Sequence, residues 1–279
     1  MVQGFSGPQR AGQRPMIGTI RNWLIDSTVA PHDVDSPAFS IAHRQVVLRK
    51  RILRGLFEKF YRECRAMDLR YFQDCPGRRL EIGSGAGIVS EVYADVITSD
   101  IKVLPFVDLV LQAEKLPFED NSLRAIYALN VFHHLSQPRD FFSELLRVVH
   151  PGGGVVLIEP FYGPLASWVF KNLHKSEGFE PEAPSWEPPV PTGPFSKANQ
   201  ALSYIIFKRD LSQFNKEFPE LDLVVQRPHT QLWYVLSGGV NFRQLLPDSL
   251  TALARFSERL LSPLNPWIAL QQTIVLRKK

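Results

Sequence analysis

The segment LEIGSGAGIVSE, residues 80–91, constrains the fold of this 279-residue chain more than any other. It places an apolar run and one carboxylate, Glu81, directly before glycines 83, 85 and 87. Glycines at such positions permit tight turns and let a ligand approach the backbone closely. A strand that runs through a glycine-rich turn into a helix is typical of α/β sheets that bind nucleotide-like ligands at strand ends.

Short apolar runs alternate with helical patterns on either side of this segment. They predict strands at 79–82, 96–99, 109–112, 125–129 and 154–158, and helices at 87–93 and 138–149. Two further strands are predicted at 221–226 and 269–276, with a helix around 247–261 between them. Strands that alternate with helices indicate an α/β fold with a doubly wound, mostly parallel, seven-stranded sheet.

Three regions follow from composition. Residues 1–41 are rich in Gly, Pro, Ser and Asp, which predicts an irregular N-terminal extension. Residues 42–75 are predicted to contain one long helix, and residues 76–279 form the main domain. Six prolines between residues 177 and 196 exclude a helix or a central strand there. The segment at about 161–215 is therefore predicted to be an inserted lid over the substrate.

The predicted helix from Ala42 to Met67 is amphipathic and basic. The face opposite its apolar residues carries Lys50, Arg51, Arg54, Arg62 and Arg65. This pattern favours a helix that packs on the core with a solvated outer face. Attraction to an anionic membrane or to a phosphorylated ligand is the alternative.

Composition excludes several classes of protein. No run of about 18 apolar residues is present, so no membrane span is predicted. The first 25 residues lack the apolar stretch of a signal peptide, although an organelle transit peptide stays open beside a poorly ordered tail. Two cysteines, Cys64 and Cys75, are too few for a disulfide framework and have no zinc-binding pattern, which favours a reducing, cytoplasmic location.

The glycine segment departs from the dinucleotide-binding pattern G-x-G-x-x-G. Its third glycine comes one position early, and Ile88 occupies the usual position. Glu81 would also repel a pyrophosphate, whereas a carboxylate suits a cationic ligand. A nicotinamide oxidoreductase is therefore disfavoured.

Five segments in order resemble those of class I S-adenosylmethionine-dependent methyltransferases, most closely the small-molecule branch that includes quinone-biosynthesis methylases. They are EIGSGAG at 81–87, the acid Asp100, QAEKLPFEDNS at 112–122, NVFHHL at 130–135 and ELLRVVHPGG at 144–153. The resemblance implies a Rossmann-like methyltransferase fold and S-adenosylmethionine as cofactor.

The resemblance also implies the cofactor-binding residues. Asp100 matches the acid that grips both ribose hydroxyls. Gln112 stands where an aspartate commonly accepts from the adenine amine, a bond that a glutamine oxygen can also accept. Arg124 replaces an acid at the start of strand four, which we interpret as a surface change. The full predicted set is Glu81, Gly83, Ser84, Gly85, Gly87, Asp100, Ile101, Gln112, Ala113, Glu114, Asn130 and Val131.

Three residues are candidates for catalysis. His133 and His134 lie on the loop that, by resemblance, faces the transferred methyl group, and His134 is the preferred general base. The alternative is that both histidines only shape the loop. Glu159 ends the fifth predicted strand, where open α/β sheets place ligand contacts; its alternative role is to accept hydrogen bonds from nearby backbone donors. The sequence predicts no metal site.

The many aromatic residues after Pro160 favour an apolar, aromatic or lipid-linked acceptor beside their role in core packing. The predicted function is methyl transfer to a small-molecule or lipid-linked acceptor, at oxygen. Nucleic acid is disfavoured because the basic residues form one helix face and no base-flipping motif is present. A methyltransferase-like binding protein without catalytic activity is the main alternative. The sequence does not predict the oligomeric state.

Overall fold

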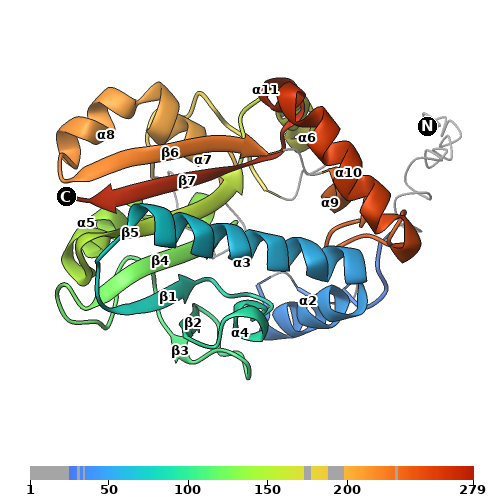
Figure 1. Cartoon of the computed structure of the whole chain (residues 1–279), viewed down its shortest axis with the longest axis horizontal. Coiled ribbons are helices and arrows are strands. Elements are labelled where there is room, and N and C mark those ends of the chain that lie inside the picture. Colours follow the sequence, from blue (N-terminus) through green and yellow to red (C-terminus); the bar gives the residue numbers. More distant parts are fainter. Residues whose placement is uncertain (1–24, 30–31, 34, 173–176, 188–197, 230–231) are drawn as a thin grey trace, which may run out of the picture.

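The computed structural model describes residues 25–29, 32–33, 35–172, 177–187, 198–229 and 232–279. Its seven strands form one sheet in the order β3-β2-β1-β4-β5-β7-β6 (Figure 1). The strands are β1 (Arg78–Ile82), β2 (Val96–Asp100), β3 (Leu109–Val110), β4 (Leu123–Leu129), β5 (Val149–Pro160), β6 (Leu221–His229) and β7 (Gln271–Lys278). Strands β1 to β5 pair in parallel, and β7 runs antiparallel to both β5 and β6. The predicted mostly parallel, seven-stranded sheet of an α/β fold is confirmed.

Of the three helices predicted after β1, one is clearly shorter than predicted. The helix predicted at 87–93 is a single turn, α4 (Val89–Val92), whereas α5 (Pro138–Val148) and α10 (Thr251–Leu261) agree closely. The remaining segments are the 3-10 turns η1 (Phe132–His134), η3 (Asp248–Leu250) and η4 (Ser262–Leu264), the π-helix η2 (Ile205–Arg209), and the helices α6 (Pro164–Asn172), α7 (Leu202–Tyr204), α8 (Leu211–Glu217), α9 (Leu232–Leu236) and α11 (Asn265–Ile268).

Each face of the sheet has its own hydrophobic core. On one face Tyr127, Val156 and Val275 pack against the two N-terminal helices, and the longer one crosses the sheet (Figure 1). On the other face Ile126, Leu157 and their neighbours pack against α5, α7, η2 and α8. Because both faces of the parallel strands are buried, residues that point to either face are apolar, and the strands are nearly continuous apolar runs.

The predicted single helix at 42–67 is two helices, so that prediction is wrong in its continuity. Helix α2 (Pro37–Arg49) begins inside the range predicted to be irregular, and α3 (Arg51–Tyr71) follows a break at Lys50. Lys50 has extended backbone angles, φ −85° and ψ 101°, and its side chain is buried. Its Nζ donates to the carbonyl oxygens of Gly239, at 2.9 Å, and Phe242. Lys50 was predicted to be a surface cation, but the break directs its side chain inward, where it joins the start of α3 to residues 239–242.

The outer face of α3 is less basic than predicted. Its buried residues Ile52, Leu53, Leu56, Phe60, Cys64 and Met67 agree with the predicted apolar face. However, Arg65 is largely buried and pairs with Asp95. Arg54 and Arg62 both pair with Glu58 on the same helix.

A buried aspartate on α3 ties the helix to the sheet. Asp68 is fully buried, and its carboxylate pairs with Arg79 Nε at 2.5 Å and Arg124 Nε at 2.6 Å. It also accepts a hydrogen bond from the Tyr127 hydroxyl at 2.7 Å. The interpretation of Arg124 as a surface change is therefore wrong, because its guanidinium neutralises a buried charge.

None of the described helices is long and apolar enough to cross a membrane. The predicted lid at about 161–215 is described in part, as α6, residues 177–187 and the helices that begin at Leu202. Residues 188–197 lie outside the described part of the chain, as do residues 1–24.

Substitution of Asp68 by alanine should destabilise the fold strongly. It would leave the largely buried guanidinium groups of Arg79 and Arg124 without this carboxylate, and breaking a buried ion pair typically costs about 3–5 kcal/mol. The graded control is Tyr127→Phe, which removes only the hydroxyl and should cost about 1 kcal/mol. Urea unfolding of both variants measures the two free energies. Equal losses would mean that the charge of Asp68 contributes nothing beyond one hydrogen bond.

Candidate functional site

The glycine turn after β1 has the geometry that its sequence requires. Gly83, Gly85 and Gly87 have φ values of +61°, +51° and +62°, which side-chain-bearing residues rarely adopt. A Cβ on Gly83 would lie 2.5 Å from Val131 Cγ2, so the turn packs directly on the loop after β4. A Cβ on Gly85 would meet only Gly83 O at 3.8 Å. The turn is thus packed at its first glycine and open at its second.

The end of β2 holds this turn in place. Asp100 Oδ2 accepts from the backbone N of Gly85 at 2.9 Å, and Oδ1 accepts from the backbone N of Lys102 at 3.0 Å. The Ser84 hydroxyl accepts from the backbone N of Ser99 at 3.1 Å. Asp100 and Ser84, both predicted to bind cofactor, are therefore brought to the glycine turn, and both also support it.

Helix α2 supplies a support that the sequence did not indicate. Arg44 Nη1 donates to the carbonyl oxygens of Ala86 at 2.7 Å and Gly87 at 3.0 Å, and Nη2 pairs with Glu91 at 2.6 Å. A lone arginine 39 positions before Gly83 carries no recognisable spacing signal. Only the packing of α2 beside the turn identifies it.

Glu81 is the most unusual ionisable group of the site. Its side chain is 1% exposed, and its Oε2 atom has no hydrogen-bond partner among the described residues. Burial raises the pKa of Glu81 to about 7, against the lowering effect of hydrogen bonds with Ser84 and Tyr61. A buried carboxylate without a full set of donors is costly and favours a cationic neighbour.

The segment after β3 is less enclosed. Gln112 is exposed, Ala113 is buried, and Ile101, which follows Asp100, is 46% exposed. Glu114 Oε1 accepts from the backbone N of Ser136 at 3.2 Å, which joins this segment to the loop after β4. These residues lie around the same edge of the sheet as the glycine turn.

The loop after β4, residues 130–135, is held in place by one carboxylate. Glu159, at the end of β5, is fully buried, and its Oε1 accepts from the backbone N of both Val131 and Phe132 at 2.9 Å. Its Oε2 contacts His133 Nδ1 at 2.6 Å and accepts from the backbone N of His133 at 3.3 Å. This geometry favours the supporting role for Glu159 over the catalytic one.

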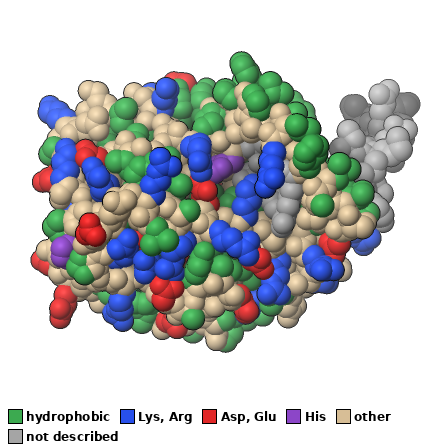
Figure 2. All heavy atoms as spheres, viewed as in Figure 1, with side chains coloured by type: hydrophobic (Ala, Val, Ile, Leu, Met, Phe, Trp, Pro, Cys, Tyr) green, Lys and Arg blue, Asp and Glu red, His purple; other side chains and the backbone are tan. Residues whose placement is uncertain are grey.

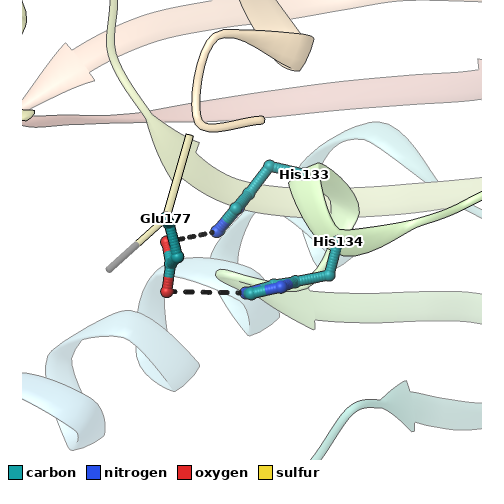
Figure 3. Close-up of side chains that lie close together, drawn as sticks. All are labelled: His133, His134 and Glu177. Atoms are coloured by element: carbon teal, nitrogen blue, oxygen red, sulfur yellow. Dashed lines mark ion pairs between the residues drawn. The ribbon is translucent and has the colours of Figure 1, made fainter. Parts of the chain in front are cut away.

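His133 and His134 converge on a carboxylate from the predicted lid. Figure 3 shows both rings directed toward Glu177. His133 Nε2 lies 3.3 Å from Glu177 Oε2, and His134 Nε2 lies 3.9 Å from Glu177 Oε1. Burial lowers the pKa of His133, but pairing with Glu159 and Glu177 outweighs it and raises the pKa to about 10. The sequence did not indicate Glu177, because no spacing relates it to the two histidines.

Gln271 is a second residue that the sequence did not indicate. It opens β7 opposite Pro160, and its Nε2 donates to Asn130 Oδ1 at 2.8 Å. Asn130 has a positive φ of 53°, which turns the chain sharply at the end of β4. Gln271 Oε1 is buried and has no hydrogen-bond partner among the described residues. Two buried acceptors, one on Glu81 and one on Gln271, are thus left for a ligand near this edge.

Comparison with known proteins finds similarity to methyltransferases. Residues 80–157 match the profile of a family described as a methyltransferase domain. The chain is 34% identical over 107 residues to demethylmenaquinone methyltransferase of Renibacterium salmoninarum, covering 32% of this chain and 45% of that protein. It is 31% identical over 123 residues to demethylmenaquinone methyltransferase of Paenarthrobacter aurescens, covering 39% of this chain and 46% of that protein.

The match thus spans somewhat less than half the length of each of these relatives. Among solved structures, geranyl diphosphate C-methyltransferase from Streptomyces coelicolor superposes with a TM-score of 0.45 at 11% identity, over 91% of this chain and 85% of that one. The match of residues 80–157 to a methyltransferase domain and the similarity to two demethylmenaquinone methyltransferases confirm the predicted resemblance to class I S-adenosylmethionine-dependent methyltransferases, similar to quinone methylases.

Proposed function

We propose that this protein transfers a methyl group from S-adenosylmethionine to an oxygen of a small-molecule acceptor. The observation that carries the proposal is Glu81, a buried carboxylate with an unsatisfied oxygen directly before a glycine turn that is open at Gly85. A nucleotide-like cofactor with a positive charge fits this combination better than a pyrophosphate does.

The residues present fit this cofactor. Glu81 would face the positively charged methionine end, and Gly85 would let the cofactor approach the backbone. Asp100, which ends β2 and is 4% exposed, would bind the ribose hydroxyls. The other residues of the predicted set would complete the cofactor site, namely Gly83, Ser84, Gly87, Ile101, Gln112, Ala113, Glu114, Asn130 and Val131. When bound, the cofactor supplies a methyl group that is already activated for displacement.

The acceptor would lie against the loop after β4. His133 and His134 come from this loop, and its first residue after Asn130, Val131, touches the glycine turn. Methyl transfer depends mainly on holding the acceptor atom near the methyl carbon, and removal of a hydroxyl proton adds to this. His134 is the residue that we assign to the acceptor's proton, and Glu159 positions the loop by accepting its backbone hydrogen bonds.

Aromatic side chains beside this loop support an acceptor with an apolar or ring-shaped body. Tyr162 stacks on Tyr204 with ring centroids 3.9 Å apart and on Phe179 with centroids 6.0 Å apart. Both relatives are named demethylmenaquinone methyltransferases, a name that points to a quinone-type acceptor. We therefore propose a phenol, a quinol or a lipid-linked ring as the acceptor class.

An exposed apolar surface supports a lipid-linked acceptor and contact with a membrane. Figure 2 shows hydrophobic side chains gathered over α10 and α11. They include Leu253, Phe256, Leu260, Leu264 and Trp267, of which Leu253 is 62% and Leu260 is 65% exposed. Beside them lies a cavity of about 620 Å³ lined by four cations, Lys59, Arg62, Arg227 and Arg259, and two carboxylates, Glu63 and Glu258. Apolar side chains beside cations suit an anionic lipid surface.

A methyltransferase-like binding protein without catalysis is the second candidate. It would explain the exposed Gln112 equally well. The two candidates differ in a direct way, because only the enzyme transfers label from methyl-labelled cofactor to an added phenol or quinol. Linkage of the label to oxygen in the product identifies the methylated atom.

Binding of S-adenosylhomocysteine should depend on the open space at Gly85. We expect micromolar binding to the wild type by calorimetry and a loss of at least tenfold, about 1.4 kcal/mol, in Gly85→Arg. The matched control is Gly152→Arg, since Gly152 also has a positive φ and no atom within 4 Å of its Cβ position. The control should bind normally. Failure of the wild type to bind would remove the enzyme proposal.

The ligand-free protein should become less stable as the pH rises from 4.5 to 7, because Glu81 loses its proton in the folded state only near pH 7. Its pKa rises from 4.5 to about 7 on folding, so the folded state binds more protons than the unfolded state in this window. The free energy of unfolding should fall by about 3 kcal/mol as pH rises through the window.

Glu81→Gln removes this titration. Urea unfolding measures the free energy of unfolding at pH 5 and at pH 8. The decrease in this free energy from pH 5 to pH 8 should be about 2 kcal/mol smaller for the variant than for the wild type. Equal losses in the two proteins would show that Glu81 ionises normally, which contradicts its description as a buried, unsatisfied carboxylate.

Anionic phospholipid vesicles should bind the protein through α10 and α11. Leu253→Ser combined with Leu260→Ser should weaken vesicle binding at least tenfold, because each leucine buried in lipid contributes about 1.5–3 kcal/mol. The matched control is Leu69→Ser, which removes a leucine of similar exposure, 57%, near the far end of α3. Co-sedimentation measures the binding. Absence of wild-type binding to anionic vesicles would contradict membrane contact.

A further inference from the structure

We propose that His133, His134 and Glu177 form a binding site for one divalent transition-metal ion. Each residue offers one ligand atom, and these three atoms all lie within 4.8 Å of one another. The candidate ligand atoms are the Nε2 atoms of both histidines and the carboxylate oxygens of Glu177 (Figure 3).

The spacing of the atoms fits coordination. In a tetrahedral site with bonds of about 2.0–2.1 Å, neighbouring ligand atoms are about 3.3–3.4 Å apart. The 3.3 Å between His133 Nε2 and Glu177 Oε2 already has this value. His134 Nε2 lies 3.9 Å from the other oxygen, Oε1, so both histidines face one carboxylate that can bind an ion through either oxygen or both. The two imidazole rings are 4.3 Å apart between centroids and tilted by 37°, so both can point at one ion.

The surroundings of His133 are those of a metal-binding histidine. Its Nδ1 lies 2.6 Å from Glu159 Oε2, which leaves Nε2 as the atom that faces Glu177. A carboxylate behind the ring nitrogen that does not bind metal fixes the orientation of the ring and raises its basicity. Glu159 cannot swing away, because it also accepts hydrogen bonds from the backbone of the loop.

The donor set identifies the class of ion. Two imidazoles and one carboxylate suit zinc and neighbouring first-row ions, whereas magnesium and calcium prefer oxygen ligands. Three protein ligands leave at least one position open, as in catalytic zinc sites.

If the protein is a methyltransferase as proposed, the open coordination position of the ion would bind the acceptor hydroxyl. An acceptor hydroxyl bound there would have its pKa lowered and would lose its proton to solvent water. In the metal-loaded enzyme the ion therefore takes over the part assigned to His134 as a base. The ion would also join the loop after β4 to the lid segment that carries Glu177.

Cobalt(II) is the probe for the site, since its visible absorption reports both binding and geometry. We expect one Co²⁺ per chain, displaced by Zn²⁺, and at least tenfold weaker binding in Glu177→Gln and in His134→Ala. Glu180→Gln is the matched control, because Glu180 is an exposed glutamate of the same segment whose described hydrogen bonds use only its backbone. It should bind Co²⁺ like the wild type.

Two results would overturn the metal site. One is a wild type that binds no Co²⁺. The other is binding that is unchanged in both Glu177→Gln and His134→Ala while circular dichroism shows both variants to be folded. Glu177 is partly exposed, so its neutral variant tests the site without opening the core.

Parallel titration of S-adenosylhomocysteine into metal-stripped protein separates this inference from the proposed function. Cofactor binding without Co²⁺ binding would overturn only the metal site, and the reverse would overturn only the methyltransferase proposal. If both ligands bind, methyl transfer should fall at least tenfold after chelation and return with Zn²⁺. Transfer that is unaffected by complete removal of metal would overturn the use of the ion in the reaction.

Discussion

The carboxylate of Glu159 is the interaction on which the arrangement of the site depends. It ends β5, is fully buried, and accepts hydrogen bonds from the backbone of the loop after β4 as well as contacting the ring of His133. A charged group at zero exposure persists only where donors surround it. The loop that supplies those donors is therefore fixed to the neighbouring strand, and its histidines are held to one orientation. The same loop touches the glycine turn through Val131, so the cofactor side and the acceptor side of the site share one support.

The order of strands and helices could be predicted from the sequence because buried parallel strands are short, apolar and separated by helical patterns. The glycine turn, Asp100 and the two histidines were also recognisable, since each follows a strand at the carboxyl edge of the sheet. Lys50 and Arg124 were misjudged for a common reason. Both are cations that looked solvated in the pattern of residues, and both are directed inward by distant partners, the carbonyl of Gly239 and the carboxylate of Asp68.

Arg44, Glu177 and Gln271 could not have been predicted by spacing. Each reaches the site from an element far along the chain, namely α2, the partly described lid and the start of β7. Their positions depend on tertiary packing, which periodicity does not encode. The segment that matches the methyltransferase family, residues 80–157, therefore contains the glycine turn and the histidines but lacks several of the side chains that complete the site.

The position of β7 between β5 and β6 has a consequence for folding kinetics. β6 pairs in the sheet with β7 alone, although it precedes β7 in the chain. Until β7 has inserted beside β5, β6 has no partner strand in the sheet. Its unpaired backbone groups and apolar side chains can then associate with other chains. Insertion of β7 is also a long-range event, which forms slowly compared with local contacts. The slowest and most aggregation-prone stage of folding should therefore be the arrival of this one antiparallel strand, after the parallel half of the sheet has already assembled.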